Sequence, residues 1–146
     1  MNEYRRLHDA SPLTEHPLLE TLARELAKKS CLNRLYSFKK NPRIGYVLKV
    51  IRVELADFLI TKMYDKFLTN YNWEAKYHVG KYDKYAQLIW KSTKKVGVGV
   101  CVKHKDIHVA LLFSPLGCTR DFKTNVRPIG PRHIHMFAVF GRNRAE

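Results

Sequence analysis

One stretch constrains the fold of this chain more than any other: residues 84–100, which read KYAQLIWKSTKKVGVGV. Its first half places Tyr85, Leu88 and Ile89 at spacings of three and four, so these side chains share one face of a short helix. The Ser-Thr pair that follows offers the backbone competing hydrogen bonds, which ends a helix. From residue 96 to 100 valine alternates with glycine, the period of a strand against which another element packs closely.

The other elements are predicted from apolar periodicity. A helix starts around residues 14–17 and runs to Lys29, and a long amphipathic helix is expected over residues 46–71. Alternation predicts strands over residues 95–103 and 107–113, joined by a turn. Residues 32–36 are expected to form a short strand.

Composition bounds the class of protein. A chain of 146 residues with 45% hydrophobic residues suits one globular domain. With 27 Lys and Arg against 13 Asp and Glu, its formal net charge of +14 favours a polyanionic partner, either anionic lipid or nucleic acid. A basic protein with no such partner is the alternative.

The three cysteines and the hydropathy pattern bear on the compartment. Cys31, Cys101 and Cys118 are odd in number and widely spaced, so they cannot form a complete disulfide framework. This favours a reducing environment. The sequence has no apolar run near the ~20 residues that span a bilayer.

Four segments together resemble one known family. Residues 85–99 resemble the signature of the CAP superfamily (cysteine-rich secretory proteins, antigen 5, pathogenesis-related 1), roughly Gly-His-aromatic-Thr-Gln-apolar-apolar-Trp, two residues, Ser/Thr, then Lys-apolar-Gly-Cys/Val-Gly. Residues 2–13 resemble its opening motif, His-Asn-x-x-Arg-x-x-His-Gly-x-Pro-x-Leu. Residues 113–118 and 122–126 resemble Tyr-x-Pro-x-Gly-Asn and Phe-x-x-Asn-Val. Cys118 replaces the Asn of the former.

The resemblance implies an α/β fold: an α/β/α sandwich with helices packed on both sides of a small, mainly antiparallel sheet. It assigns residues 1–126 to the CAP domain and leaves residues 127–146 as a C-terminal extension, an added strand or a loose tail. His8 is expected to cap the end of the first helix.

Most CAP domains hold two His and two Glu that can bind a divalent metal. The resemblance places these four ligands on Tyr36, Tyr46, Phe67 and Lys84. Lys84 would repel a metal and Phe67 has no lone pair to offer. We therefore expect no metal, no cofactor, and a cleft filled with aromatic and aliphatic side chains.

Enzymatic activity has little support in the sequence. The pairs His104/His108 and His133/His135 lack Cys or carboxylate partners at a ligand spacing, which favours structural histidines. Ser92 and Ser114 have no nucleophile-elbow context. We expect a protein that is not an enzyme.

Two features predict lipid binding. Tyr77, Tyr82 and Tyr85 fit the aromatic-x4-aromatic-x2-aromatic pattern called the caveolin-binding motif, at the place where sterol-binding CAP proteins carry theirs. Covering the edge of the core is an equally good explanation of these tyrosines. Two basic loops would contact an anionic surface, through Lys39, Lys40, Arg43, Lys91, Lys94 and Lys95.

The sequence thus predicts a non-catalytic CAP protein that binds lipid or sterol at anionic membranes. It is similar to the intracellular branch of the family, the Golgi-associated plant pathogenesis-related protein. We therefore expect an intracellular location, cytoplasmic or peripheral on Golgi-type membranes, or an extracellular one if an N-terminal signal is missing from this sequence. A homodimer stays open. The alternatives are a nucleic-acid-binding module, in which aromatics interleaved with lysine stack on bases, and a protein-interaction domain or decayed paralogue.

Overall fold

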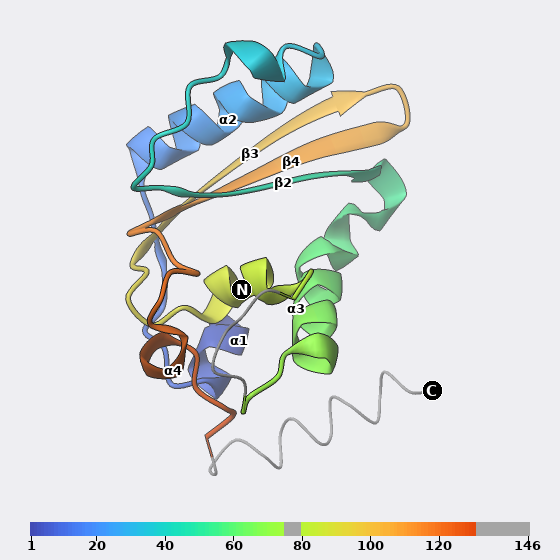
Figure 1. Ribbon diagram of the computed structural model, residues 1–146. Helices are drawn as coiled ribbons and strands as arrows, with labels where there is room; N and C mark the ends of the chain where they lie inside the picture. Colours follow the sequence, from blue (N-terminus) through green and yellow to red (C-terminus); the bar gives the residue numbers. More distant parts are fainter. Residues whose placement is uncertain (75–79, 131–146) are drawn as a thin grey trace.

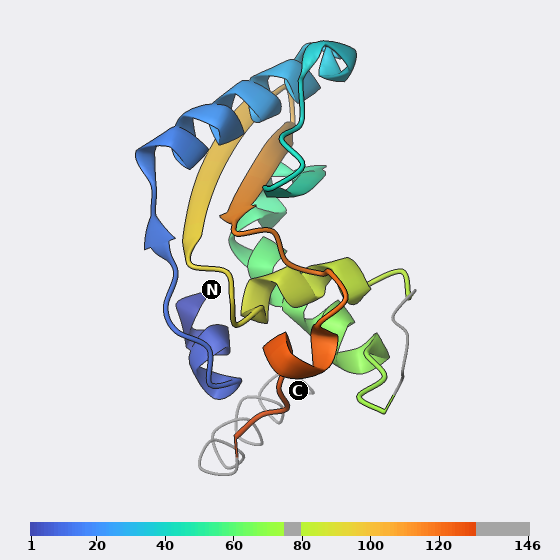
Figure 2. The same ribbon diagram turned by 60° about the vertical axis from the view of Figure 1, so that its left-hand side comes forward.

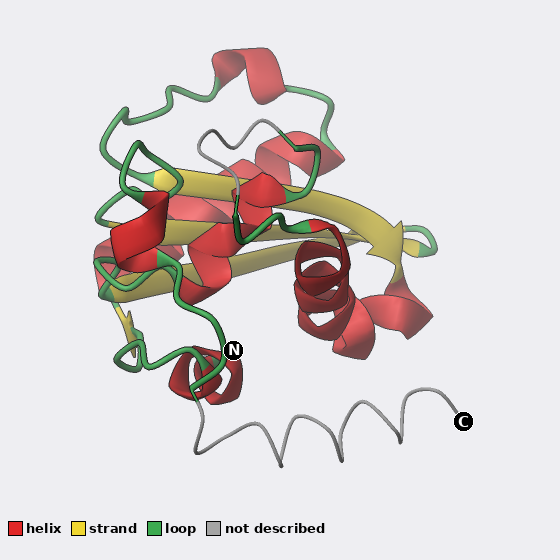
Figure 3. Ribbon diagram, turned by 60° about the horizontal axis from the view of Figure 1, so that its bottom comes forward, coloured by secondary structure: helices red, strands yellow, loops and turns green. Residues whose placement is uncertain are grey.

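The computed structural model describes residues 1–74 and 80–130. In chain order the elements are α1 (Asn2–Leu7), β1 (Thr14–Glu15), α2 (Pro17–Cys31), η1 (Leu35–Ser37), β2 (Gly45–Arg52), η2 (Val53–Phe58), α3 (Leu59–Asn70), η3 (Asp83–Ile89), β3 (Lys95–Lys103), β4 (Asp106–Ser114) and α4 (Phe122–Asn125), where η denotes a 3-10 helix. The sheet lies between α2 on one face and α3 with η3 on the other (Figures 1 and 3). This is the predicted α/β architecture.

The sheet is mixed, with strand order β1-β3-β4-β2. The pairs β3–β4 and β2–β4 are antiparallel, whereas the two-residue strand β1 lies parallel to the start of β3. Both predicted strands are present, and residues 104 and 105 make the turn between them. Because β1 pairs only with Lys95 and Val96, β3 is an outer strand of the described sheet beyond that point.

Helix α2 lies directly on β3 and β4 (Figure 2). Its buried face repeats at helical spacing, with Ala23 and Ala27 both fully buried. A Cβ atom on Gly97 would lie 2.2 Å from the backbone of Leu19, and one on Gly99 would lie 2.2 Å from that of Ala23. The glycines of β3 therefore let the helix backbone approach the strand, as their alternation predicted.

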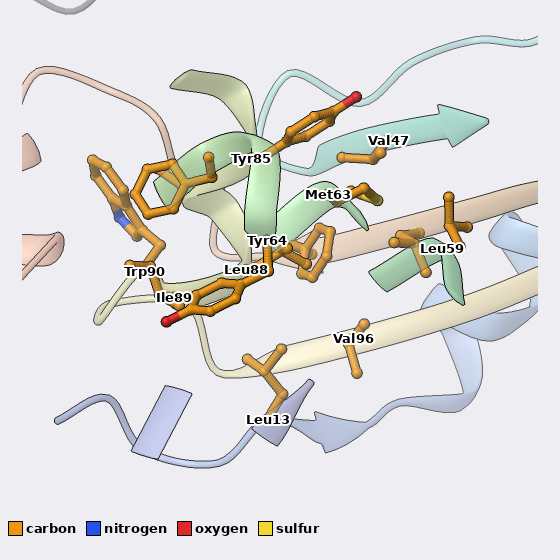
Figure 4. Close-up of a cluster of buried hydrophobic side chains, with 14 of the residues drawn as sticks. Leu13, Val47, Leu59, Met63, Tyr64, Tyr85, Leu88, Ile89, Trp90 and Val96 are labelled. Carbon is orange, nitrogen blue, oxygen red and sulfur yellow. The ribbon is translucent and has the colours of Figure 1, made fainter. Parts of the chain in front are cut away.

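The larger hydrophobic core lies on the opposite face of the sheet. Figure 4 shows Met63 and Leu59 of α3 with Tyr85 and Leu88 of η3 and Val47 of β2. All five side chains are at most 7% exposed. Burial on this face holds α3 and η3 against the sheet.

The prediction of one helix over residues 46–71 was wrong. Residues 45–52 form strand β2, paired with β4 along its whole length, and the α-helix begins only at Leu59. Leu48, Ile51 and Leu55 fit helical spacing, yet the first segment is rich in β-branched residues and alternates between the two faces. Pairing of every residue with a long neighbouring strand decided between the two periods.

Smaller differences concern the loops. Residues 35–37 form a 3-10 helix where a short strand was expected. The start of the C-terminal extension contacts α1, since the Gly130 N–H donates to the Leu7 carbonyl at 2.9 Å. Residues 131–146, and with them His133 and His135, lie outside the described part of the chain. All three cysteines are free.

Candidate functional site: a lysine-lined cleft beside the signature segment

The signature segment is held by its own polar side chains. The Gln87 amide nitrogen donates to the Thr93 hydroxyl at 2.7 Å, and its oxygen accepts the Gly117 N–H at 2.8 Å. Thr93 in turn donates to the Pro115 carbonyl at 2.9 Å. Both side chains, Gln87 and Thr93, are buried, so they join η3 to the segment after β4 rather than face a ligand.

The closing motif completes this network. The Asn125 side-chain oxygen accepts the Ser92 N–H at 2.9 Å, and its backbone carbonyl accepts the Lys91 N–H at 3.0 Å. Cys118 adopts a left-handed conformation, φ 57°, which Asn takes more readily. Its thiol donates to the Lys84 carbonyl at 3.3 Å, and burial raises its pKa to about 12. Ser92 is thus engaged structurally and Cys118 is a neutral thiol.

Arg5 has a role that sequence reasoning missed. Its guanidinium is fully buried and donates to the carbonyl groups of Ser11, Leu88, Trp90 and Thr93, at 2.6 to 3.2 Å. Burial lowers its pKa to about 10. Arg5 belongs to the opening motif, but the sequence does not show its role, because three of its four acceptors lie more than 80 residues away.

His8 is the C-cap residue of α1, as predicted, through its backbone N–H. Its ring makes longer-range contacts. Nδ1 donates to the Arg127 carbonyl and Nε2 accepts from the Tyr64 hydroxyl, both at 2.6 Å. Burial lowers the pKa of this imidazole. Both nitrogens are used, which makes His8 a structural residue.

The four positions that align with the metal ligands do not converge. Tyr36 is 87% exposed in η1, and Tyr46 packs beside α2, where Phe38 meets it edge to face. Phe67 is buried in the core on the other face. Lys84 is exposed in η3. The described residues contain no group of three or more His, Cys, Asp or Glu side chains that could hold a metal ion.

The other candidate histidines are accounted for where they are described. His104 occupies the turn between β3 and β4, with φ 57°. His108 Nδ1 lies 2.6 Å from the Ser30 hydroxyl of α2.

A cleft of about 320 Å³ opens between β2, α3 and η3. Its floor is apolar, made by Ile51, Leu59, Met63, Tyr82 and Tyr85. Its other lining residues are all lysines, Lys49, Lys62, Lys66, Lys81 and Lys84, and we call this site the lysine cleft. This cleft was not predicted from the sequence, because Lys49 was placed on the same helix as Lys62 and Lys66. In the structure Lys49 lies on strand β2, and the other two lysines lie on helix α3.

Two of the three motif tyrosines line this cleft. Tyr85 is 3% exposed and Tyr82 is half-buried against it, with ring centroids 6.0 Å apart. They therefore cover the core and form the cleft floor at once. Tyr77 lies outside the described residues. Trp90 is 1% exposed and packs edge to face on Phe122, so it is not free to stack on a base.

The two predicted basic loops meet at one end of the sheet. Strands β2 and β3 flank β4 and both begin at the end where β4 finishes. The Arg43 carbonyl accepts the Leu116 N–H at 3.1 Å, and the Lys94 N–H donates to the Ser114 carbonyl at 2.9 Å. The cations of these two loops, called here the sheet-end cluster, are all exposed: Lys39, Lys40, Arg43, Lys91, Lys94 and Lys95.

Comparison with known families identifies the fold. The model of the cysteine-rich secretory protein family, CAP, matches residues 1–113. The chain belongs to the CAP family. A search among curated protein sequences returned no match.

Three solved CAP structures illustrate the likeness. Venom allergen-like protein 4 of Schistosoma mansoni has 23% identity and a TM-score of 0.58, over 84% of this chain and 79% of that one. NaASP2, solved with Zn²⁺, has 14% identity and a TM-score of 0.63, over 88% and 80%. Hookworm platelet inhibitor has 14% identity and a TM-score of 0.56, over 93% and 74%. At these identities the likeness shows the fold alone.

None of the described helices combines the length and apolar character that crossing a bilayer requires.

Proposed function

We propose that this CAP domain is a non-catalytic protein that binds lipid or sterol and associates peripherally with anionic membranes, as the Golgi-associated branch of the family does. The observation that carries the proposal is the meeting of two basic loops in the sheet-end cluster. The Leu116 N–H donates to the Arg43 carbonyl and the Lys94 N–H donates to the Ser114 carbonyl, so both loops lie at the same end of the sheet. A flat anionic surface can contact such a cluster as a unit.

The energy of this contact follows from the charge count. Each Lys or Arg near an anionic leaflet contributes about 1 kcal/mol, so six exposed cations would hold the protein reversibly. Salt would weaken the contact, because exposed charges are screened over about 10 Å at 0.1 M ionic strength. Tyr82 and Tyr85 add a surface for an apolar ligand, since both line the lysine cleft.

Co-sedimentation with vesicles tests the proposal. We expect binding to phosphatidylserine-containing vesicles, none to phosphatidylcholine vesicles, and loss of binding as salt rises. Removing two charges in Lys94→Gln/Lys95→Gln should weaken binding by about 2 kcal/mol, roughly thirtyfold. A sterol-dependent increment should be lost in Tyr82→Ala.

Lys103→Gln/Lys105→Gln is the matched control, because it removes two charges at the opposite end of the same strand pair. Lys94 and Lys103 each also donate one hydrogen bond to a carbonyl group. Equal weakening in both variants would refute binding through the sheet-end cluster. It would show that vesicle binding depends only on the net charge of the protein. Tight binding to single-stranded DNA without vesicle binding would favour the nucleic-acid alternative.

A further inference from the structure

The lysine cleft combines two properties that a simple surface hollow does not have. Its floor is built from side chains of the hydrophobic core, of which Met63 and Tyr85 are each 3% exposed (Figure 4). Its walls carry five lysines, which come from β2, from α3, from η3 and from the loop that precedes η3. Residues far apart in sequence therefore bring cations around one apolar patch.

The arrangement of the ammonium groups is paired. Lys49 and Lys84 lie 4.9 and 5.5 Å from the centroid of the Tyr85 ring. Lys66 and Lys81 lie 5.6 and 5.5 Å from the centroid of the Tyr82 ring. Each ring thus faces two cations, and the two members of each pair repel one another.

No carboxylate offsets this charge within the described lining. The residues that form the cleft include no Asp or Glu, and none of the five lysines forms an ion pair with a described carboxylate. Asp83, the acidic residue of η3, accepts the Gly80 N–H at 2.9 Å and is not among the lining residues. A bound anion would relieve the repulsion, and it would be attracted by all five lysines together.

The floor and the volume restrict what that anion can be. An inorganic anion would leave the apolar floor uncovered, whereas an apolar chain attached to it would remove that surface from water. A volume of about 320 Å³ is at the lower end for small-molecule sites, which suits one chain rather than two. Two or more negative charges would make contact with both lysine pairs.

We propose that the lysine cleft binds a single-chain amphiphile whose head group carries two negative charges, such as an alkyl phosphate monoester, with its chain on the floor formed by Met63, Tyr82 and Tyr85. This rests on the proposed lipid-binding function and names the ligand class. The cleft is separate from the sheet-end cluster, because the two share no residue. Lys84, which stands where the CAP signature has His, contributes to a site for anions.

Isothermal titration calorimetry with dodecyl phosphate, below its critical micelle concentration, tests this proposal. We expect saturable binding of one ligand per chain that weakens with salt. Inorganic phosphate, which has no chain, and dodecyl maltoside, which has no charge, should each bind at least tenfold more weakly. Equal affinity for inorganic phosphate and dodecyl phosphate would overturn the role of the floor.

Charge variants separate this site from the membrane surface. Lys49→Gln/Lys84→Gln should lose at least tenfold in affinity for dodecyl phosphate and keep its binding to acidic vesicles. Lys94→Gln/Lys95→Gln should show the reverse. The cleft lysines are exposed or half-buried, and none forms an ion pair with another residue in the described ranges, so the variant should fold, which circular dichroism checks. Lys66→Gln/Lys81→Gln provides an independent second pair.

The two proposals can fail separately. Dodecyl phosphate binding that is unchanged in both cleft variants would overturn the inference, whatever the vesicles show. Cleft-dependent binding without any vesicle binding would support the inference and refute membrane association.

Discussion

The packing of α2 on β3 yields a prediction whose size can be worked out from one distance. A Cβ atom added at Gly99 would lie 2.2 Å from the Ala23 carbonyl carbon, whereas ordinary van der Waals contact begins at 3.4 Å. The Gly99→Ala variant therefore requires α2 to move away from the strand by about 1.2 Å at this turn. The obstacle is helix backbone, so no side chain can rotate to relieve it.

Such overpacking costs about 1–3 kcal/mol. We expect a value at the upper end, because the same displacement separates Ala23 and Ala27 from the sheet. The smaller conformational freedom of the unfolded alanine variant offsets about 0.4–1 kcal/mol. The net expectation is a loss of about 2 kcal/mol in the free energy of unfolding.

Urea unfolding measures this loss as a lower midpoint at unchanged slope. Val98→Ala is the control, since Val98 is the neighbouring residue, points away from α2 and is 43% exposed. The Gly97→Ala/Gly99→Ala double variant should cost less than the sum of its two single variants, because one displacement of α2 accommodates both methyl groups. A Gly99→Ala variant within about 0.5 kcal/mol of the original protein would refute the reasoning.

Two buried polar side chains give further predictions. Arg5→Met leaves the Leu88, Trp90 and Thr93 carbonyls without their donor, so we expect the free energy of unfolding to fall by about 3 kcal/mol in urea, and by far less in Arg6→Met on the exposed side of α1. Burial holds the pKa of His8 below its ordinary 6.5, so the folded protein binds fewer protons than the unfolded chain and stability should fall as pH drops below about 6.5. His8→Gln should reduce that decline, measured as urea midpoints at about pH 7.5 and 5.5; an equal decline in the variant would show that other groups cause it.

The fold was predictable where local pattern and global role agree. Strand β3 was predicted because its valines and glycines alternate without interruption. The glycines also predicted that another element packs closely against the strand, and this element is α2. Strand β2 was not found, because the spacing of Leu48 and Ile51 satisfies a helical period as well. Only the partner strand β4, more than 50 residues away, distinguishes the two.

The candidate site was predictable only in part, for a similar reason. Tyr82 and Tyr85 carry a linear motif and were identified. The lysines around them were not, apart from Lys84, because each of them, taken singly, is an ordinary surface cation of a basic chain. These lysines surround one cleft only because β2, α3 and η3 pack together, and the sequence of a single segment does not show that packing.

The buried guanidinium of Arg5 has a consequence for the order in which the chain matures during synthesis. Three of its four acceptors lie 83 to 88 residues further along, and His8 bonds to a carbonyl 119 residues away. Because a nascent chain emerges from its N-terminus, Arg5 must stay hydrated until Thr93 has left the ribosome. Residues 1–10 thus reach their final contacts only after η3 and the segment that follows it have been made, and a product that stops before η3 leaves α1 without the partners that fix it in place.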